Sequence, residues 1–157
     1  MKILRPDAAD PFEDLAAQTE YFRYLDVSTF PAQVSEYVKD PRVRERGDPR
    51  CAHDYYLESV LSSDPLAGKD RTDSPRIQCC LHFVCIRRGS RLIFRYTGVV
   101  SFGCDVTRGA WPGSFPQVLQ DEVTLEGRLV RHEWALENHN SICIMCSDFS
   151  YSLEKLT

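Results

Sequence analysis

The chain of 157 residues lacks a long apolar run and lacks an export signal. No apolar stretch approaches the ~20 residues that a membrane-spanning helix needs. The amino-terminal residues Met1–Asp7 are too few and too soon charged for a secretory signal peptide. We therefore expect a cytoplasmic protein that makes no contact with a membrane.

The sequence also lacks a recognisable catalytic or cofactor motif. No glycine pattern follows a predicted strand and opens a helix, as phosphate-binding loops require, and no Ser or Cys stands in a nucleophile-elbow context. His132-Glu133 resembles the start of a zinc-protease motif, but Leu136 occupies the position of the second histidine. We expect no catalytic residue and no cofactor, and we favour a non-enzymatic role while leaving an enzyme open.

An excess of positive charge is missing as well, since the net charge is −4. Proteins that bind nucleic acid normally carry a basic face that neutralises phosphates, so we expect no nucleic-acid partner. The segment Lys39–Arg50 is the exception, with five basic and three acidic residues. We interpret it as a solvated linker, and a contact with an anion or an acidic partner is the alternative.

The seven cysteines do not form a disulfide or metal pattern. Their number is odd and no export signal is present, so we expect free, mostly buried thiols. Cys143 and Cys146 have the spacing of zinc and redox sites, but strand positions three apart point to opposite faces. Since Cys79 and Cys80 are adjacent, no second pair with that spacing exists, and we predict no metal site.

The carboxy-terminal two-thirds of the chain contains short predicted strands joined by tight turns. Arg91–Phe102 carries large apolar residues at alternate positions, which is the period of a half-buried strand. Gly89 and Gly127 each separate two such runs and predict antiparallel hairpins. The last predicted strand, Ser141–Tyr151, is either central in a sheet or kinked by a bulge near Ser147-Asp148. We count six strands, over His53–Leu61, Arg76–Arg87, Arg91–Phe102, Val118–Leu125, Arg128–Leu136 and Ser141–Tyr151.

The first forty residues have helical patterns instead. Asp10-Pro11-Phe12-Glu13 combines a capping side chain, a proline for the first turn and a glutamate that returns the cap. The apolar face predicted after this start consists of Phe12, Leu15, Ala16, Thr19 and Phe22. A second short helix is predicted from the same spacing of Phe30, Val34, Tyr37 and Val38.

These patterns predict an α+β fold in one domain over residues 1–157, because the length is that of a typical domain. The helical segment covers residues 1–40 and the β-rich core covers residues 51–153. We expect a mainly antiparallel, strongly curved sheet or partly closed barrel of about six strands. One or two amino-terminal helices pack against this sheet or across an open end of it.

Two predicted loops are long, Ser62–Pro75 and Gly103–Gln117, and the second contains Trp111 and Phe115. These two rings either plug one end of the sheet, which we favour, or present a contact surface. If Trp111 is exposed, it is our first candidate for a binding hot spot. Both residues are therefore candidate binding residues.

Histidines and acids that are adjacent in the sequence do not predict acid–base pairs. In strands, His53 and Asp54, like His132 and its neighbour Glu133, would face opposite sides. We expect His82 to be a neutral core histidine and His139 to be exposed. His53 and His132 remain candidate binding residues, because they and a nearby acid can converge in space.

Residues 53–151 resemble small uncharacterised bacterial β-rich proteins, some of which are grouped with toxin-immunity proteins. The resemblance is carried by His53-Asp54, the hairpin Ile77–Phe102, Asp121-Glu122, His132-Glu133, Ser141-Ile142-Cys143-Ile144 and Asp148-Phe149. It implies a protein-binding module, with an immunity-type inhibitor as one form, whose partner is another protein. The alternative is a small-ligand or enzymatic pocket within the curved sheet, and self-association through a sheet edge stays open.

Overall fold

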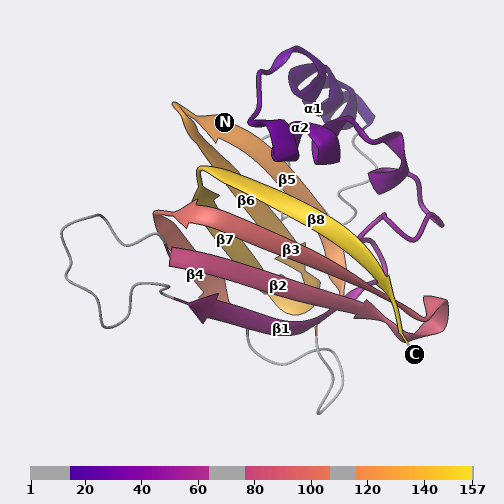
Figure 1. The fold of residues 1–157 in the computed structure, drawn as a ribbon. Coiled ribbons are helices and arrows are strands. Elements are labelled where there is room, and N and C mark those ends of the chain that lie inside the picture. The colour runs from indigo at the N-terminus through magenta and orange to yellow at the C-terminus, as the bar shows by residue number, and fades with distance from the viewer. Residues whose placement is uncertain (1–14, 64–76, 107–115, 157) are drawn as a thin grey trace, which may run out of the picture.

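The computed structural model describes residues 15–63, 77–106 and 116–156, with the backbone alone for residues 15–17. Within these residues the fold is α+β, as predicted, with two α-helices followed by eight strands (Figure 1). The elements are α1 (Leu15–Val27), α2 (Ala32–Lys39), β1 (Tyr56–Ser63), β2 (Ile77–Cys85), β3 (Ser90–Val99), β4 (Ser101–Asp105), β5 (Val118–Glu126), β6 (Leu129–Leu136), β7 (Ser141–Cys146) and β8 (Asp148–Lys155). Short 3-10 helices cover Pro41–Val43 (η1), Ile86–Arg88 (η2) and Glu137–His139 (η3).

The strands form two four-stranded antiparallel sheets. Sheet A has the order β1-β2-β3-β8, and sheet B has the order β4-β7-β6-β5. The predicted hairpins β2–β3 and β5–β6 are confirmed. Gly89 and Gly127 stand after η2 and between β5 and β6, with φ of 57° and 65°, a region that glycine adopts without steric cost.

The predictions of about six strands and of a partly closed barrel were wrong. Two of the predicted strands break and pass from one sheet to the other. Arg91–Phe102 divides at Val100, two residues after Gly98, which has a φ of +60°, and Ser141–Tyr151 divides at Ser147. The two bends are joined, because the Ser147 amide donates to the carbonyl oxygens of Thr97 and Gly98 at 3.1 and 3.2 Å. Eight strands in two sheets result.

The main apolar core lies between the two sheets. The Trp134 ring of sheet B contacts Phe83 and Phe94 of sheet A, at centroid distances of 4.5 and 4.8 Å. All three side chains are buried. Val100 and Phe102 were predicted on the same buried face as Phe94, but they are 63% and 41% exposed. They follow the bend, so the period of two predicted from β3 does not reach them.

Some predicted boundaries also differ from the structure. The long loops predicted from Ser62 and from Gly103 start later, because β1 reaches Ser63 and β4 reaches Asp105. Of the strand predicted over His53–Leu61, the first three residues lie before β1. Strand ends carry weaker sequence signals than strand centres, so these shifts are of the expected kind.

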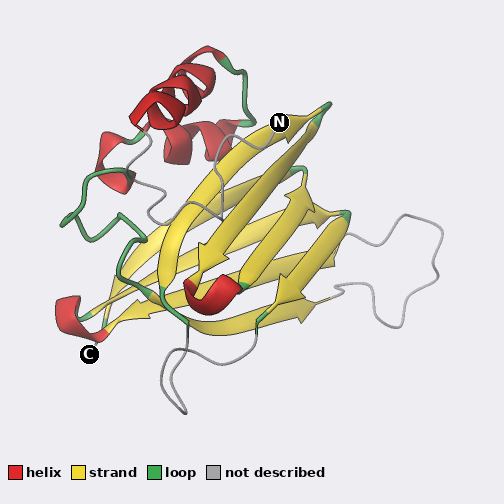
Figure 2. Ribbon diagram, turned by 180° about the vertical axis from the view of Figure 1, so that it is seen from behind, coloured by secondary structure: helices red, strands yellow, loops and turns green. Residues whose placement is uncertain are grey.

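Both helices lie on the same side of the molecule, beside β8 and β5 (Figures 1 and 2). The second predicted helix is confirmed, and its four predicted apolar residues are buried: Phe30, Val34, Tyr37 and Val38. Among the described side chains of α1, Tyr21 and Leu25 are buried and Phe22 is half-buried, whereas Thr19, which was predicted on the apolar face, is exposed. The predicted cap at residues 10–13 lies outside the described residues.

Helix α1 also satisfies backbone groups of β5, an edge strand of sheet B. The Val123 amide donates to the Tyr21 hydroxyl oxygen at 2.6 Å, and the Leu125 amide donates to the Tyr24 hydroxyl oxygen at 2.7 Å. Unpaired edge groups are a template for pairing with another chain. Tyrosines of α1 therefore protect part of this edge.

All seven cysteines carry free thiols. Cys51, Cys79, Cys85 and Cys146 are buried, Cys80 and Cys143 are half-buried and Cys104 is exposed. The prediction of free, mostly buried thiols is confirmed, and Cys143 and Cys146 differ in burial as expected for opposite faces of β7. In the part of the chain that the structure describes, neither helix is long and apolar enough to cross a bilayer.

Candidate ligand pocket

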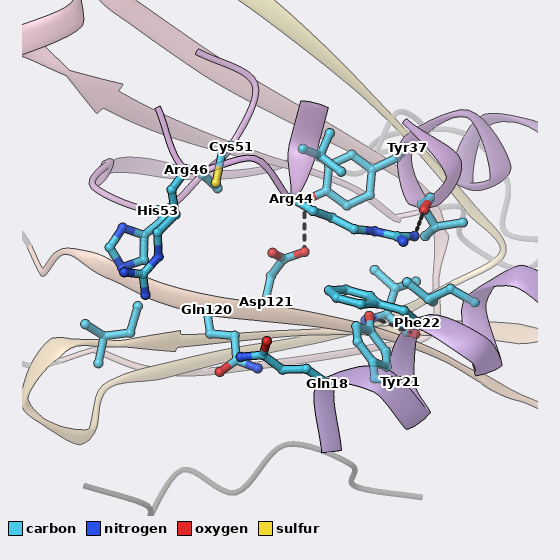
Figure 3. Close-up of a pocket in the computed structure, with 16 residues that line it drawn as sticks. Gln18, Tyr21, Phe22, Tyr37, Arg44, Arg46, Cys51, His53, Gln120 and Asp121 are labelled. Atoms are coloured by element: carbon cyan, nitrogen blue, oxygen red, sulfur yellow. Dashed lines mark hydrogen bonds between the residues drawn. The ribbon is translucent and has the colours of Figure 1, made fainter. Parts of the chain in front are cut away.

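A pocket of about 340 Å³ lies between the helices, the segment that leads to β1, and strand β5 (Figure 3). The helical side is mostly apolar and aromatic, with Gln18, Tyr21, Phe22, Leu25, Tyr37 and Val38. The segment between α2 and β1 contributes Val43, Arg44, Arg46, Cys51, Ala52 and His53. Strand β5 contributes Leu119, Gln120, Asp121 and Val123.

The segment Lys39–Arg50, interpreted as a solvated linker, is mostly exposed, but Val43, Arg44 and Arg46 within it line the pocket. Val43 is buried, and the Arg44 guanidinium donates to the carbonyl oxygen of Val38. The same guanidinium lies 4.6 Å from the centre of the Phe22 ring, within the range of a cation–π contact. Local contacts thus fold this charged segment against both helices.

The turn that begins this segment is held by Asp40. Its carboxylate accepts hydrogen bonds from the Arg42 amide at 3.0 Å and from the Arg42 guanidinium at 2.8 and 2.9 Å. The Tyr151 hydroxyl of β8 donates to the same carboxylate at 2.8 Å. These donors, with Arg42 the largest cause, hold the pKa of Asp40 well below its usual value.

Asp121 places a carboxylate at the boundary between pocket and core. Its Oδ2 accepts a hydrogen bond from the Tyr37 hydroxyl at 2.9 Å and lies 3.0 Å from Nε2 of His132. The Asp121 side chain is 22% exposed, whereas His132 is fully buried. Figure 3 shows the carboxylate reaching into the pocket, with its second oxygen turned away from Tyr37.

A chain of hydrogen bonds continues from His132 into the core. The Tyr96 hydroxyl lies 3.0 Å from Nδ1 of His132, and Nε1 of Trp134 donates to the Tyr96 hydroxyl oxygen at 3.0 Å. Burial raises the pKa of Tyr96 well above its usual value of 10.0, so the hydroxyl keeps its proton. Its oxygen accepts from Trp134, and with its proton donated to Nδ1 of His132, the Nε2–H group of His132 donates to Asp121.

Tyr37 is a donor for the same physical reason. Burial, followed by the nearby charge of Asp121, raises the pKa of Tyr37 well above 10.0. Oδ2 of Asp121 therefore receives two hydrogen bonds from protonated groups, which complement the negative charge of the carboxylate. Its Oδ1 faces the pocket as an acceptor for an N–H or O–H group of a bound molecule.

His53 lies on another part of the pocket wall, next to Arg46 (Figure 3). Nδ1 of His53 is 2.9 Å from Oδ1 of Asp54, which contradicts the prediction that the two side chains face opposite sides. They stand in a turn before β1, where Asp54 has a φ of +74°. Gln117 donates to the Asp54 carboxylate at 3.1 Å, and Arg88 lies 3.5 Å from it, so this turn is well supported.

Cys51 also lines the pocket, but its chemistry is that of a structural thiol. Burial raises the pKa of Cys51 above its usual value of 9.0. A reactive cysteine requires the opposite shift, because the thiolate is the nucleophile. We therefore assign Cys51 to packing rather than to covalent chemistry.

The predicted site residues have different positions. Trp111 and Phe115 lie outside the described residues. His53 lines the pocket, and His132 lies behind it, one hydrogen bond beyond Asp121. His82, expected in the core, is half-buried in β2 on the face opposite its buried neighbours, and His139 is exposed as expected.

Sequence reasoning missed Asp121 as a site residue. One signal was present, since Asp121 stands two residues before the buried Val123 and therefore points to the same face of the strand. A carboxylate on a buried face needs hydrogen-bonding partners or contact with water. Tyr37, which lies 84 positions away in the chain, was not recognisable as such a partner.

No protein-family model matches the chain, and the search of curated proteins found no match. Among solved structures, the chain is similar to an uncharacterized protein from Neisseria gonorrhoeae, with a TM-score of 0.44 and 14% sequence identity. The similarity covers 64% of this chain and 91% of that one. The likeness is too low to support an argument about fold or function.

Proposed function

We propose that the protein binds a small organic molecule in the pocket between the helices and β5. The observation that carries this proposal is the Asp121 carboxylate, which faces the pocket while Tyr37 and His132 hydrogen-bond its other oxygen. Binding pockets for small molecules are mostly apolar concavities of about 300–1,000 Å³ with a few placed polar groups. The volume of about 340 Å³ and the aromatic lining agree with that description.

The lining restricts the chemistry of the ligand. Asp121 accepts hydrogen bonds and repels anions, so the group that meets it is an ammonium or another strong N–H or O–H donor. Tyr21, Phe22 and Leu25 provide an apolar surface for the remainder of the molecule. At about 30 Å³ per water, the pocket has the volume of about eleven waters, which suits a ligand of about ten non-hydrogen atoms.

The test is an NMR titration of the ¹⁵N-labelled protein with two matched probes, phenethylamine and 3-phenylpropanoate. The two molecules share a phenyl ring and a two-carbon chain but carry opposite charges. Phenethylamine is expected to shift the amide signals of the pocket residues in α1 and β5 in a saturable way, and 3-phenylpropanoate is expected to bind at least about tenfold more weakly.

Two variants locate the binding site. Asp121→Asn replaces the charged acceptor and is expected to weaken phenethylamine binding about tenfold. Asp26→Asn removes an exposed carboxylate from α1, outside the pocket, and is expected to leave binding unchanged. The proposal fails if neither probe binds, if both bind equally well, or if the two variants behave alike.

The protein-binding module predicted from the sequence, including an immunity-type inhibitor, stays a prediction. So do the cytoplasmic location, the bacterial source and a protein partner. We favour the ligand pocket, because a specific side-chain arrangement supports it. Co-precipitation of a protein partner by both the wild type and Asp121→Asn would favour the binding module instead.

A further inference from the structure

We propose that the pocket selects a primary ammonium over an amidinium or guanidinium group, because Tyr37 and His132 occupy one carboxylate oxygen of Asp121. This inference rests on the proposed function and specifies the class of cation that the same pocket takes. It makes Tyr37 a specificity-determining residue. The selection depends on how many acceptor atoms each kind of cation needs and how many Asp121 offers.

Oδ2 of Asp121 has no capacity left for a ligand. The Tyr37 hydroxyl lies 2.9 Å from this oxygen, and Nε2 of His132 lies 3.0 Å from it. A carboxylate oxygen has two lone pairs, and these two donors use both. In the described part of the chain, the hydrogen bonds of Asp121 all go to Oδ2, and Oδ1 is turned away from Tyr37 (Figure 3). A ligand therefore meets a carboxylate with a single available oxygen.

Aromatic packing holds both donors in place. The Tyr37 ring contacts Phe149 and Tyr151, with centroid distances of 5.5 and 5.0 Å. The His132 ring lies 4.7 Å from that of Phe149 and 4.4 Å from that of Trp134. Tyr37 and His132 are both buried, so a ligand that displaced either donor would leave a buried polar group unpaired, at a cost in free energy. Oδ2 consequently stays occupied when a ligand enters.

The two kinds of cation need different numbers of acceptor atoms. Amidinium and guanidinium groups carry parallel N–H donors in one plane and bind a carboxylate most strongly through both of its oxygens. An ammonium is a compact charge with rotatable donors, so a bond from one N–H to one oxygen is sufficient. At Asp121 the second N–H of a planar cation finds Oδ2 already occupied. We therefore expect the planar cation to bind more weakly, although its charge is the same.

Phenethylamine and benzamidine test this selection in the wild-type protein. Both are cations with a phenyl ring, a single positive charge and the same number of non-hydrogen atoms, so size does not distinguish them. In NMR titrations of the ¹⁵N-labelled protein, phenethylamine is expected to bind at least about tenfold more tightly than benzamidine. A difference of that size corresponds to one charge-assisted hydrogen bond.

Tyr37→Phe removes one donor from Oδ2 and keeps the packed ring. Because Tyr37 lines the pocket, this change makes Oδ2 accessible to a ligand. The affinity for benzamidine is expected to rise about tenfold, while that for phenethylamine changes by less than about threefold. Tyr56→Phe, at an exposed position of β1 outside the pocket, is the matched control and should keep the wild-type ratio of affinities. Partial unfolding would lower both affinities alike, so the ratio reports on selection.

The His132 imidazole gives a second readout, which needs no variant. A ligand on Oδ1 leaves both hydrogen bonds to Oδ2 intact. The ring ¹⁵N signals of His132 should therefore keep the values of an imidazole with its proton on Nε2 when phenethylamine saturates the pocket. Conversion to another protonation form would mean that the ligand replaces His132 at Oδ2, which overturns the inference.

The outcomes separate this inference from the proposed function. If phenethylamine binds and benzamidine binds equally well or more tightly, the selection is wrong and the ligand pocket stands. If the ratio of the two affinities is the same in Tyr37→Phe and the wild type, the occupied Oδ2 does not cause the selection, and the inference is wrong as well. If neither cation binds at the residues of the pocket, the proposed function itself is wrong.

Discussion

The carboxylate of Asp121 and the imidazole of His132 are diagonal neighbours on paired strands, with Oδ2 and Nε2 3.0 Å apart. In the β5–β6 register His132 stands opposite Val123, two residues beyond Asp121. The imidazole is fully buried, between the Trp134 ring at 4.4 Å and the Phe149 ring at 4.7 Å. This pair therefore connects the surface of the pocket with the centre of the core.

The first prediction concerns the energetic coupling of Asp121 and His132. Asp121→Asn and His132→Leu each weaken or remove the hydrogen bond, and His132→Leu also leaves the Tyr96 hydroxyl without its acceptor. We expect each single variant to lower the free energy of unfolding by about 1–3 kcal/mol. In the double variant the loss should be smaller than the sum, by about 1 kcal/mol or more. Urea unfolding of the four proteins measures this coupling.

The control for this cycle combines His132→Leu with Asp26→Asn. Asp26 is exposed on α1, so its effect should add to that of His132→Leu within about 0.5 kcal/mol. If the stability losses of Asp121→Asn and His132→Leu also add within about 0.5 kcal/mol, the hydrogen bond between Asp121 and His132 contributes nothing to stability. The chain of hydrogen bonds from Asp121 through His132 to Tyr96 would then not stabilise the fold as we predict.

The second prediction concerns the attachment of α1 to the edge of sheet B. Tyr21→Phe keeps the ring but removes the hydroxyl that accepts from the Val123 amide at 2.6 Å. Since a buried amide without an acceptor is costly, we expect a loss of about 1–3 kcal/mol. Hydrogen exchange of the Val123 amide should become faster. Tyr56→Phe, at an exposed position of β1, should change neither quantity, and unchanged exchange in Tyr21→Phe would refute the prediction.

The third prediction compares two glycines with similar backbone angles. Gly98 and Gly89 have φ of +60° and +57°, so alanine is strained at either position. At Gly98 a Cβ atom would also stand 2.1 Å from Oγ and 3.1 Å from Cβ of Ser147, whereas at Gly89 no atom lies within 4 Å. Gly89→Ala should cost about 1–2 kcal/mol. Thermal unfolding should show a clearly larger loss for Gly98→Ala, and equal losses would contradict the tight contact between the two bends.

The fourth prediction concerns alkaline pH. Burial raises the pKa of Cys79 to about 11 and that of Cys146 to about 12, from the value of 9.0 expected in the unfolded chain. Above pH 9 the unfolded state loses these protons while the folded state retains them, so folding stability falls as pH rises. We expect the unfolding free energy to be highest below pH 9 and to decrease through pH 11–12.

Substitution of one thiol checks the cause of this decrease. Cys79→Ser removes a group that titrates in this range, so the slope of unfolding free energy against pH should be shallower between pH 9 and pH 11. Cys104→Ser, at the exposed position in β4, should change the slope less. If the two variants have the same slope, ionisation of the buried thiol is not responsible.

Much of the secondary structure follows from local patterns. Alternation in β3 identified Leu92, Phe94 and Tyr96 as buried, and glycines at 89 and 127 marked the two hairpins. The strand count was too low because a glycine within an apolar run does not reveal whether the strand continues or bends. The bend at Gly98 depends on Ser147, a residue that no local window contains.

By itself the sequence determined where the chain forms helices and strands and which side of most strands is apolar, because these properties depend on neighbours a few positions apart. The packing of the helices and sheets determines that two strands pass between sheets and that Tyr37 and the buried His132 both contact Asp121 at the wall of the pocket. Those contacts join residues far apart in the chain, and their stability comes from burial and hydrogen bonds that exist only after the helices and both sheets have packed together.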